Sequence, residues 1–263
     1  MAGTPLEFLV SACLLPSVRE KYSSSFDLLE IPEALRIDES LGPHGTVFFR
    51  EYHGQKYNDR WSEQMGGSAL GTELSSEMVR LIEDFRKIDI DWVSGHLVGK
   101  RVSEVSFDLQ CWLRSFRDRE PLALSLGISD GELRRAEKLI GEGFGLTDRI
   151  LCNGDFYPRN LIKTERRMVV VDWGYWPGNR ACFIDHMPNV VAFAFVHMWN
   201  NDEWQKKFLD GVLAVSGVNL NDLRRAILIK AFEQASFWKN LPILLPPQLL
   251  HFRMALEDRL PLS

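Results

Sequence analysis

The sequence has few of the features that mark secreted, metal-binding or membrane proteins. Its four cysteines, Cys13, Cys111, Cys152 and Cys182, are scattered along 263 residues, and no two form a Cys-x-x-Cys pair. This spacing supports neither a zinc site nor a disulfide framework, so we expect reduced thiols in a cytoplasmic protein. No apolar run approaches the roughly 20 residues of a membrane-spanning helix. The N-terminal apolar run follows Glu7 rather than a basic segment, which gives little support for a signal peptide.

The sequence also lacks a net positive charge and several motifs typical of catalytic sites. The formal net charge of -5 argues against broad binding to nucleic acids or anionic membranes. The six histidines are dispersed, and the absence of a Gly-x-Ser-x-Gly motif leaves a hydrolase without support. The composition, 45% hydrophobic and 25% charged, is that of an ordinary globular protein. At this length one large domain or two unequal lobes are both compatible with the sequence.

The periodicity predicts a small, partly β N-terminal piece and a large helical piece, hence an α+β fold. Residues 1–30 are expected to be helical or mixed, with Pro16 interrupting their apolar patch. Ala34 to Ile37 and Thr46 to Tyr52 are expected as strands, the second buried because β-branched and aromatic residues fill it. Asn160 to Lys163 and Met168 to Asp172 are expected as two more. Helices are expected over residues 75–88, 105–116, 129–140, 185–200, 202–215, 221–238 and 247–260, the third opened by a capping box of Ser129 with Glu132.

The chain is organised around the stretch from Leu151 to Trp176, which places three polar residues at the ends of short strands. Asp155 and Asn160 stand in the order Asp-x-x-x-x-Asn, and Asp172 follows twelve residues after Asn160. In phosphoryl transfer a carboxylate accepts the proton of the substrate hydroxyl, while an amide oxygen and a second carboxylate bind Mg²⁺. These residue types therefore predict Asp155 as the base and Asn160 and Asp172 as the metal ligands. A solvated hairpin in a helical protein would leave all three unexplained.

This stretch resembles the catalytic and metal-binding loops of the aminoglycoside phosphotransferase and choline kinase-like enzymes. The segments NGDFYPRNLI (153–162) and VVVDWGYW (169–176) match the family's pattern at Gly154, Asp155, Pro158, Asn160, Asp172 and Trp173. These enzymes are distant relatives of protein kinases and phosphorylate small-molecule hydroxyls. The resemblance therefore implies a protein-kinase-like bilobal fold, ATP or GTP and Mg²⁺ as cofactors, and a hydroxyl substrate such as an aminoglycoside, an amino alcohol or a sugar-like compound.

The resemblance also assigns roles outside the central motif. The segment TVFFREYHG (46–54) resembles the last strand of the N-terminal lobe running into the interlobe hinge, so Glu51 and Tyr52 are expected to bind the nucleotide. Arg159 is equally compatible with a phosphate contact and with a solvated loop residue. Asp185 resembles a structural acid that ties down the catalytic loop. The expected division is a shortened N-terminal lobe and hinge over 1–60 and a helical C-terminal lobe over 61–263.

Two departures from the family pattern bear on activity. Asn153 stands where the family usually has His, and a carboxamide can still make orienting hydrogen bonds. A complete kinase N-terminal lobe has a Gly-rich turn, a strand Lys and a helix Glu, whereas the 45 residues before Thr46 hold no Gly-rich turn and one lysine, Lys21. We interpret this as truncation, with Glu20 as the candidate helix acid; making residues 46–52 the Lys strand, with Arg50 substituting, leaves no room for the remaining strands.

Truncation leaves three possibilities open. The nucleotide binds without the missing strands, a partner chain or a second copy completes the lobe, or the protein is a catalytically impaired, pseudokinase-like binding or scaffolding protein. The intact trio of Asp155, Asn160 and Asp172 favours the enzyme.

Overall fold

The computed structural model describes residues 10–38, 40–41, 46–56, 69–97, 120–143, 145, 149–173, 184–198, 202–240 and 245–263. The chain forms two compact units that are interleaved along the sequence. The first combines Met1–Trp61, Glu77–Ser106 and Arg149–Asp185, and the second combines Ser62–Ser76, Phe107–Asp148 and His186–Ser263. The central stretch thus belongs to the same compact unit as the N-terminal segment. The division into lobes at residue 60 stays a prediction.

The first unit begins with helical turns that bury the N-terminal apolar patch. A π-helical turn, η1 (Val10–Leu14), leads into α2 (Leu15–Tyr22) and a short 3-10 turn, η2 (Ser23–Ser25). Pro16 lies in the first turn of α2, where a helix has no use for the N–H that proline lacks, so it does not interrupt the buried patch. Val18 is fully buried, as are Val10, Leu14 and Leu15.

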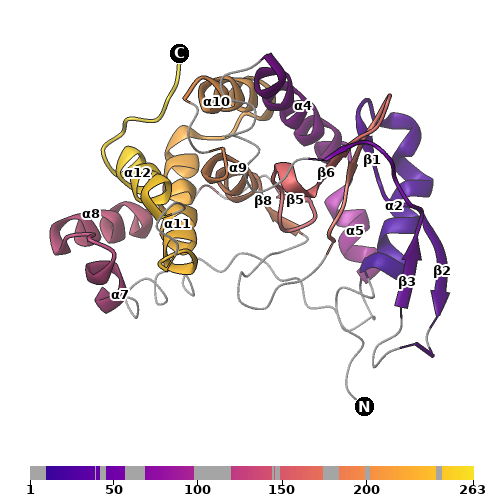
Figure 1. Ribbon diagram of the computed structural model, residues 1–263, viewed down its shortest axis with the longest axis horizontal. Coiled ribbons are helices and arrows are strands. Elements are labelled where there is room, and N and C mark those ends of the chain that lie inside the picture. The colour runs from indigo at the N-terminus through magenta and orange to yellow at the C-terminus, as the bar shows by residue number, and fades with distance from the viewer. Residues whose placement is uncertain are drawn as a thin grey trace. The chain divides into compact units, whose positions relative to one another are not determined.

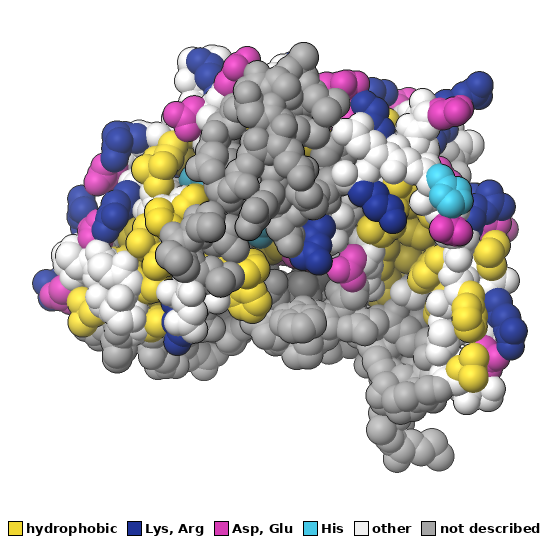
Figure 2. All heavy atoms as spheres, in the orientation of Figure 1, with side chains coloured by type: hydrophobic (Ala, Val, Ile, Leu, Met, Phe, Trp, Pro, Cys, Tyr) yellow, Lys and Arg dark blue, Asp and Glu magenta, His cyan; other side chains and the backbone are white. Residues whose placement is uncertain are grey.

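The two expected N-terminal strands are confirmed, but the burial of the second is wrong. The strands β2 (Ala34–Asp38) and β3 (Thr46–Phe49) pair antiparallel, with Ile37 opposite Val47. Within the described residues they form a two-stranded sheet of their own. Phe48 is 41% exposed and Phe49 37%, and Figure 2 shows hydrophobic side chains on the surface at the position of this hairpin. β-propensity therefore predicted the strands and not the burial of the second one.

The central hairpin of the first unit lies in a four-stranded sheet of order β1-β7-β6-β4. Figure 1 labels its strands β1 and β6. The expected strands are present as β6 (Leu161–Lys163) and β7 (Met168–Val170), paired antiparallel. β1 (Leu29–Glu30) joins β7 in parallel, and β4 (Gln55–Lys56) joins β6 antiparallel. A separate two-stranded sheet pairs β5 (Arg149–Leu151) with β8 (Ile184–His186). Asp185, expected at a helix start, lies in β8 instead and is buried.

Asp84 anchors the start of β1 to a helix. It lies near the end of α4 (Ala69–Arg86), which begins six residues before the expected start at residue 75 and is followed by α5 (Ile90–Leu97). Its buried carboxylate accepts the backbone N–H groups of Asp27, Leu28 and Leu29 at 2.9, 2.7 and 2.7 Å. Burial alone would raise the pKa of Asp84, but hydrogen bonds from Lys87 and these N–H groups lower it. The carboxylate therefore stays charged and holds the strand in place.

The described part of the second unit is helical, and the expected helices of this region are confirmed where the structure describes them. Ser129 Oγ accepts the N–H of Glu132 at 3.3 Å, and a Glu132 carboxylate oxygen accepts the N–H of Ser129 at 2.8 Å, so the predicted capping box is confirmed. α11 packs against α9 and α12, and every residue of α9 is buried. The expected helix over 105–116 lies outside the described residues. The helices are α7 (Glu120–Ser125), α8 (Asp130–Gly141), α9 (Met187–Val196), α10 (Asp202–Ser216), α11 (Leu220–Phe237) and α12 (Leu245–Leu256).

No described helix combines the length and the apolar character needed to span a bilayer.

A buried histidine makes the second unit sensitive to acid. Burial, and then the neighbouring charge of His197, lowers the pKa of His251 from 6.5 to about 3. As the pH falls below 6.5 the unfolded chain binds a proton that the folded chain does not, so stability is lost down to about pH 3. We expect His251 to lower the free energy of unfolding by about 2 kcal/mol between pH 7 and pH 5. Urea titrations of the wild type and of His251→Gln, which cannot titrate, measure this difference; equal pH slopes would contradict it.

Candidate active site

The loop between β5 and β6 brings Asp155 and Asn160 into direct contact. The chain turns at Gly154, whose φ of 76° is readily accessible only to glycine. It then forms a 3-10 turn, η3 (Pro158–Asn160). The side-chain amide of Asn160 donates to the backbone oxygen of Asp155 at 2.9 Å and to its carboxylate at 3.1 Å. Because the amide nitrogen is committed to Asp155, Oδ1 is the atom of Asn160 that suits a hard cation.

A second set of hydrogen bonds ties this loop to the segment that carries Asp172. The backbone N–H of Val171 donates to the backbone oxygen of Asn160 at 2.9 Å. The fully buried Asn153 donates from Nδ2 to the backbone oxygens of Val171, at 3.0 Å, and Asp155, at 3.3 Å. One carboxamide thus bridges the loop of the predicted base and the residue before the predicted metal ligand. These are the orienting hydrogen bonds that the sequence analysis expected a carboxamide to make at position 153, where the family usually has His.

Asp172 lies in a strained backbone position next to the buried Trp173. Its φ of 56° is in the left-handed region, which is uncommon for a residue with a side chain and is enriched at functional sites. Trp173 is buried and donates from its indole N–H to the backbone oxygen of Val170 at 2.7 Å. The ring of Phe85 lies edge-on to Trp173 and to Phe156, with centroids 6.3 and 5.8 Å away. These rings anchor both loops from behind and leave the Asp172 carboxylate exposed.

A pocket of about 460 Å³ opens beside Asp172. That volume is in the range of small-molecule sites. The segment after β3, residues 50–52, forms one part of its wall, and the backbone amides of Glu51 and Tyr52 make no hydrogen bond with other described residues. They are therefore available to a ligand. The described lining residues are Ser11, Pro32, Phe49, Arg50, Glu51, Tyr52, Lys56, Ile162, Val171, Asp172 and Trp173.

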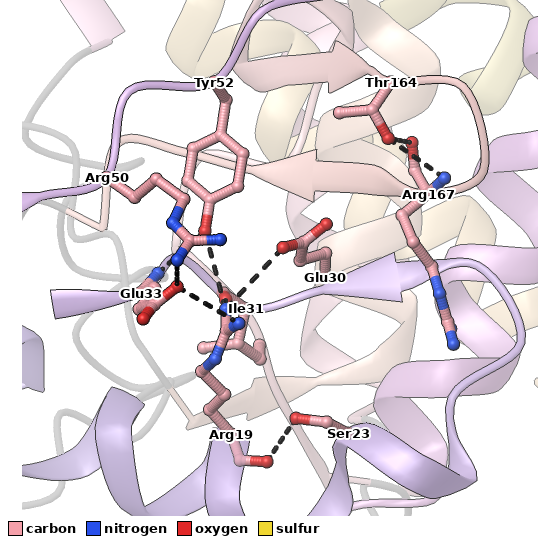
Figure 3. A network of polar contacts seen from close by, with 9 residues as sticks. All are labelled: Arg19, Ser23, Glu30, Ile31, Glu33, Arg50, Tyr52, Thr164 and Arg167. Atoms are coloured by element: carbon pink, nitrogen blue, oxygen red, sulfur yellow. Dashed lines mark hydrogen bonds and ion pairs between the residues drawn. The ribbon is translucent and has the colours of Figure 1, made fainter.

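A polar network holds the segment after β3 in position (Figure 3). The Tyr52 hydroxyl accepts the backbone N–H of Glu33 at 2.9 Å, and the Arg50 guanidinium lies 2.8 Å from the Glu33 carboxylate. Arg19 on α2 donates to the backbone oxygen of Ile31 at 2.7 Å and lies 3.5 Å from the Glu33 carboxylate. No local pattern of residues marks Arg19, because its partners Ile31 and Glu33 lie 12 and 14 residues away in the chain. Glu20, the candidate helix acid, is exposed on α2.

The structure gathers most of the residues predicted from the sequence. Asp155 and Asn160 are in contact, and Asp172 lies on the segment bonded to Asn160. Glu51 and Tyr52 line the pocket together with Asp172. Arg159 is exposed on η3 and is not among the described lining residues.

Comparison with solved structures identifies the fold. No protein-family model and no curated protein sequence matches the chain. The GDP complex of wild-type aminoglycoside 2'-phosphotransferase-IIIa superposes with a TM-score of 0.62 at 9% identity, covering 96% of this chain and 82% of that one. The gentamicin complex of APH(2″)-IIa gives 0.52 at 13% identity over 95% and 81% of the two chains. A glucosamine kinase gives 0.52 at 14% identity over 94% and 69%.

These similarities show that the chain has the protein-kinase-like α+β fold of the aminoglycoside phosphotransferases. The expectation of this fold from the sequence is thereby confirmed. At such low identities the likeness concerns the fold, and the chemistry has to be argued from the chain's own residues.

Proposed function

We propose that this protein transfers a phosphoryl group from ATP or GTP to the hydroxyl of a small molecule in the presence of Mg²⁺. The observation that carries the proposal is the hydrogen-bonded set of Asp155, Asn160 and the Val171–Asp172 segment beside a ligand-sized pocket. Phosphoryl transfer needs few covalent steps from the protein, so catalysis depends on positioning and on charge neutralisation. Two carboxylates and a carboxamide held in fixed positions fit both requirements.

The oxygen atoms of this site are suited to bind Mg²⁺ and to act as a general base. Oxygen atoms of Asn160 and Asp172 are the hard ligands that Mg²⁺ prefers, and Asp172 is exposed on the pocket wall. Bound Mg²⁺ would neutralise the charge on the transferred phosphate. Asp155 would accept the proton of the attacking hydroxyl, with its carboxylate oriented by the Asn160 amide at 3.1 Å. Asn153 would keep the base and the metal-binding segment in register through its two backbone contacts.

The pocket also fits a nucleotide. Free backbone groups at Glu51 and Tyr52 can pair with the edge of a planar base, and Ile162 and Trp173 offer apolar surface to its faces. Arg159, exposed one residue before Asn160, would contact a phosphate. The structural relatives include a gentamicin complex and a glucosamine kinase. We therefore propose a hydroxyl-bearing amino sugar, an aminoglycoside or an amino alcohol as the acceptor.

A nucleotide titration tests this proposal. We expect ATP or GTP to raise the melting temperature of the wild-type protein, and to raise it further with Mg²⁺, because a ligand that binds only the folded state stabilises it. If Mg²⁺ caused no further change in melting temperature, the proposed enzymatic function would be contradicted. Transfer of label from [γ-³²P]ATP or [γ-³²P]GTP to a panel of aminoglycosides, choline and amino sugars then measures turnover.

The retained trio also permits a second candidate, a binding or scaffolding protein without turnover. A nucleotide shift with no transfer to any acceptor, in the wild type alone and with a candidate partner chain, would favour it. A partner chain or a second copy that completes the N-terminal lobe remains a proposal, and restoration of transfer by such a chain would support it.

A further inference from the structure

A nucleotide bound in the pocket needs a cation besides Mg²⁺, and the one lysine before Thr46 does not supply it. A nucleoside triphosphate carries more negative charge than one Mg²⁺ neutralises. The one lysine before Thr46, Lys21, lies on α2 with its ammonium group 4.2 Å from the centre of the Trp92 ring, and it does not line the pocket. Arg50 lines the pocket, but its guanidinium is paired with Glu33 at 2.8 Å.

Lys56 on β4 is placed to supply that charge. β4 pairs with β6 so that Lys56 lies opposite Ile162 and Gln55 opposite Lys163. Residues directly opposite each other in an antiparallel pair share one face of the sheet, and both Lys56 and Ile162 line the pocket. Lys56 is exposed, and no described residue forms an ion pair with it.

A comparison with Lys163 shows why Lys56 is the lysine at the pocket: side chains alternate between the two faces of the sheet. Lys163, one residue along β6 from Ile162, is 2.8 Å from the Glu77 carboxylate, so its charge is already used in an ion pair. Lys56 lies on the other face of the same strand pair, so its ammonium group is available to bind a ligand. Consecutive residues of a strand point to opposite faces, which separates these two roles.

A glycine fixes the backbone that carries Lys56. A Cβ at Gly54 would lie 2.2 Å from the backbone oxygen of Lys163, a distance that no side chain tolerates. The chain after Tyr52 can therefore approach β6 and pair with it only because residue 54 is glycine. The position of Lys56 at the pocket follows from this close approach.

We propose that the ammonium group of Lys56 binds the phosphates of the nucleotide in this pocket. The inference rests on the proposed function, because it assumes that the pocket takes a nucleotide. A lysine ammonium is a compact point charge suited to phosphate oxygens. It is placed on the pocket wall that also carries Asp172, so positive and negative groups are both available for a Mg²⁺–phosphate ligand.

Calorimetric titration of ATP and GTP with Mg²⁺, and of adenosine and guanosine without it, tests the assignment in the full chain. We expect Lys56→Met to weaken binding of the preferred nucleotide about 10- to 100-fold and to leave binding of the matching nucleoside unchanged. Lys56→Arg should restore most of the nucleotide affinity. The control is Lys206→Met, which removes an equally exposed lysine on α10 and should change neither affinity.

Each outcome decides a separate point. Equal nucleotide affinities for Lys56→Met and Lys206→Met would overturn the assignment, and so would an equal loss of nucleoside and nucleotide binding, which would mean that Lys56 shapes the pocket. A wild-type protein that binds neither nucleotide would overturn the proposed function itself. Thermal unfolding of the ligand-free variants verifies that all of them fold.

Discussion

Asp155→Asn is expected to abolish measurable phosphoryl transfer while leaving nucleotide binding intact. Asparagine keeps the size of the side chain and the hydrogen-bonded loop around it, but it cannot accept the proton of the attacking hydroxyl. General bases contribute about 10²- to 10⁴-fold to rate, and we expect kcat to fall by that factor. The Mg²⁺-dependent rise in melting temperature should stay, because nothing in the proposed site gives Asp155 a contact to the nucleotide.

A matched variant separates loss of the base from loss of charge. Asp91→Asn removes an exposed carboxylate on α5 in the same compact unit and should leave kcat unchanged. Retained turnover in Asp155→Asn would remove Asp155 from the role of base. Lost turnover together with a lost nucleotide shift would place Asp155 in nucleotide binding instead.

Removal of the Asp172 carboxylate is expected to abolish the Mg²⁺-dependent part of the nucleotide shift and to reduce kcat/KM by about 10²- to 10³-fold. The physical reason is that a divalent ion bound by two protein oxygens loses its only charged ligand in the proposed site. Measurements of melting temperature with nucleotide alone and with nucleotide plus Mg²⁺ separate this effect from general weakening of the pocket.

The left-handed backbone of Asp172 decides which substitution is the cleaner test. Asparagine is tolerated at positive φ, whereas alanine pays about 1–2 kcal/mol there. Residue 172 has a φ of 56°. Asp172→Asn should therefore lose the Mg²⁺ response while its ligand-free melting temperature stays at the wild-type value. Asp172→Ala should lose the Mg²⁺ response and also melt at a lower temperature. An unchanged Mg²⁺ response in Asp172→Asn would exclude Asp172 as the carboxylate ligand.

Local chemistry explains why the central hairpin and the capping box were predictable. The Asp-x-x-x-x-Asn spacing and the strands beside it depend on residues close together in sequence, and the structure places Asp155 and Asn160 in direct contact. Ser129 and Glu132 satisfy each other three residues apart, so their sequence was sufficient. The burial of Thr46–Phe49 failed as a prediction because it depends on which distant strands cover the hairpin, and strand propensity carries no information about that.

The sequence by itself determined the fold class and the residue types of the predicted base and metal ligands, because the β6–β7 hairpin, the helix cap and the motif each depend on residues close together in sequence. Only the tertiary structure showed which of two lysines lines the pocket. Lys56 and Lys163 are similar residues on paired strands, and their surroundings differ through the register that places Lys56 opposite Ile162. Arg19, Glu33 and Tyr52 likewise meet only through folding. Such contacts depend on side chains that come together across the fold, and a linear pattern of residues does not encode their distances.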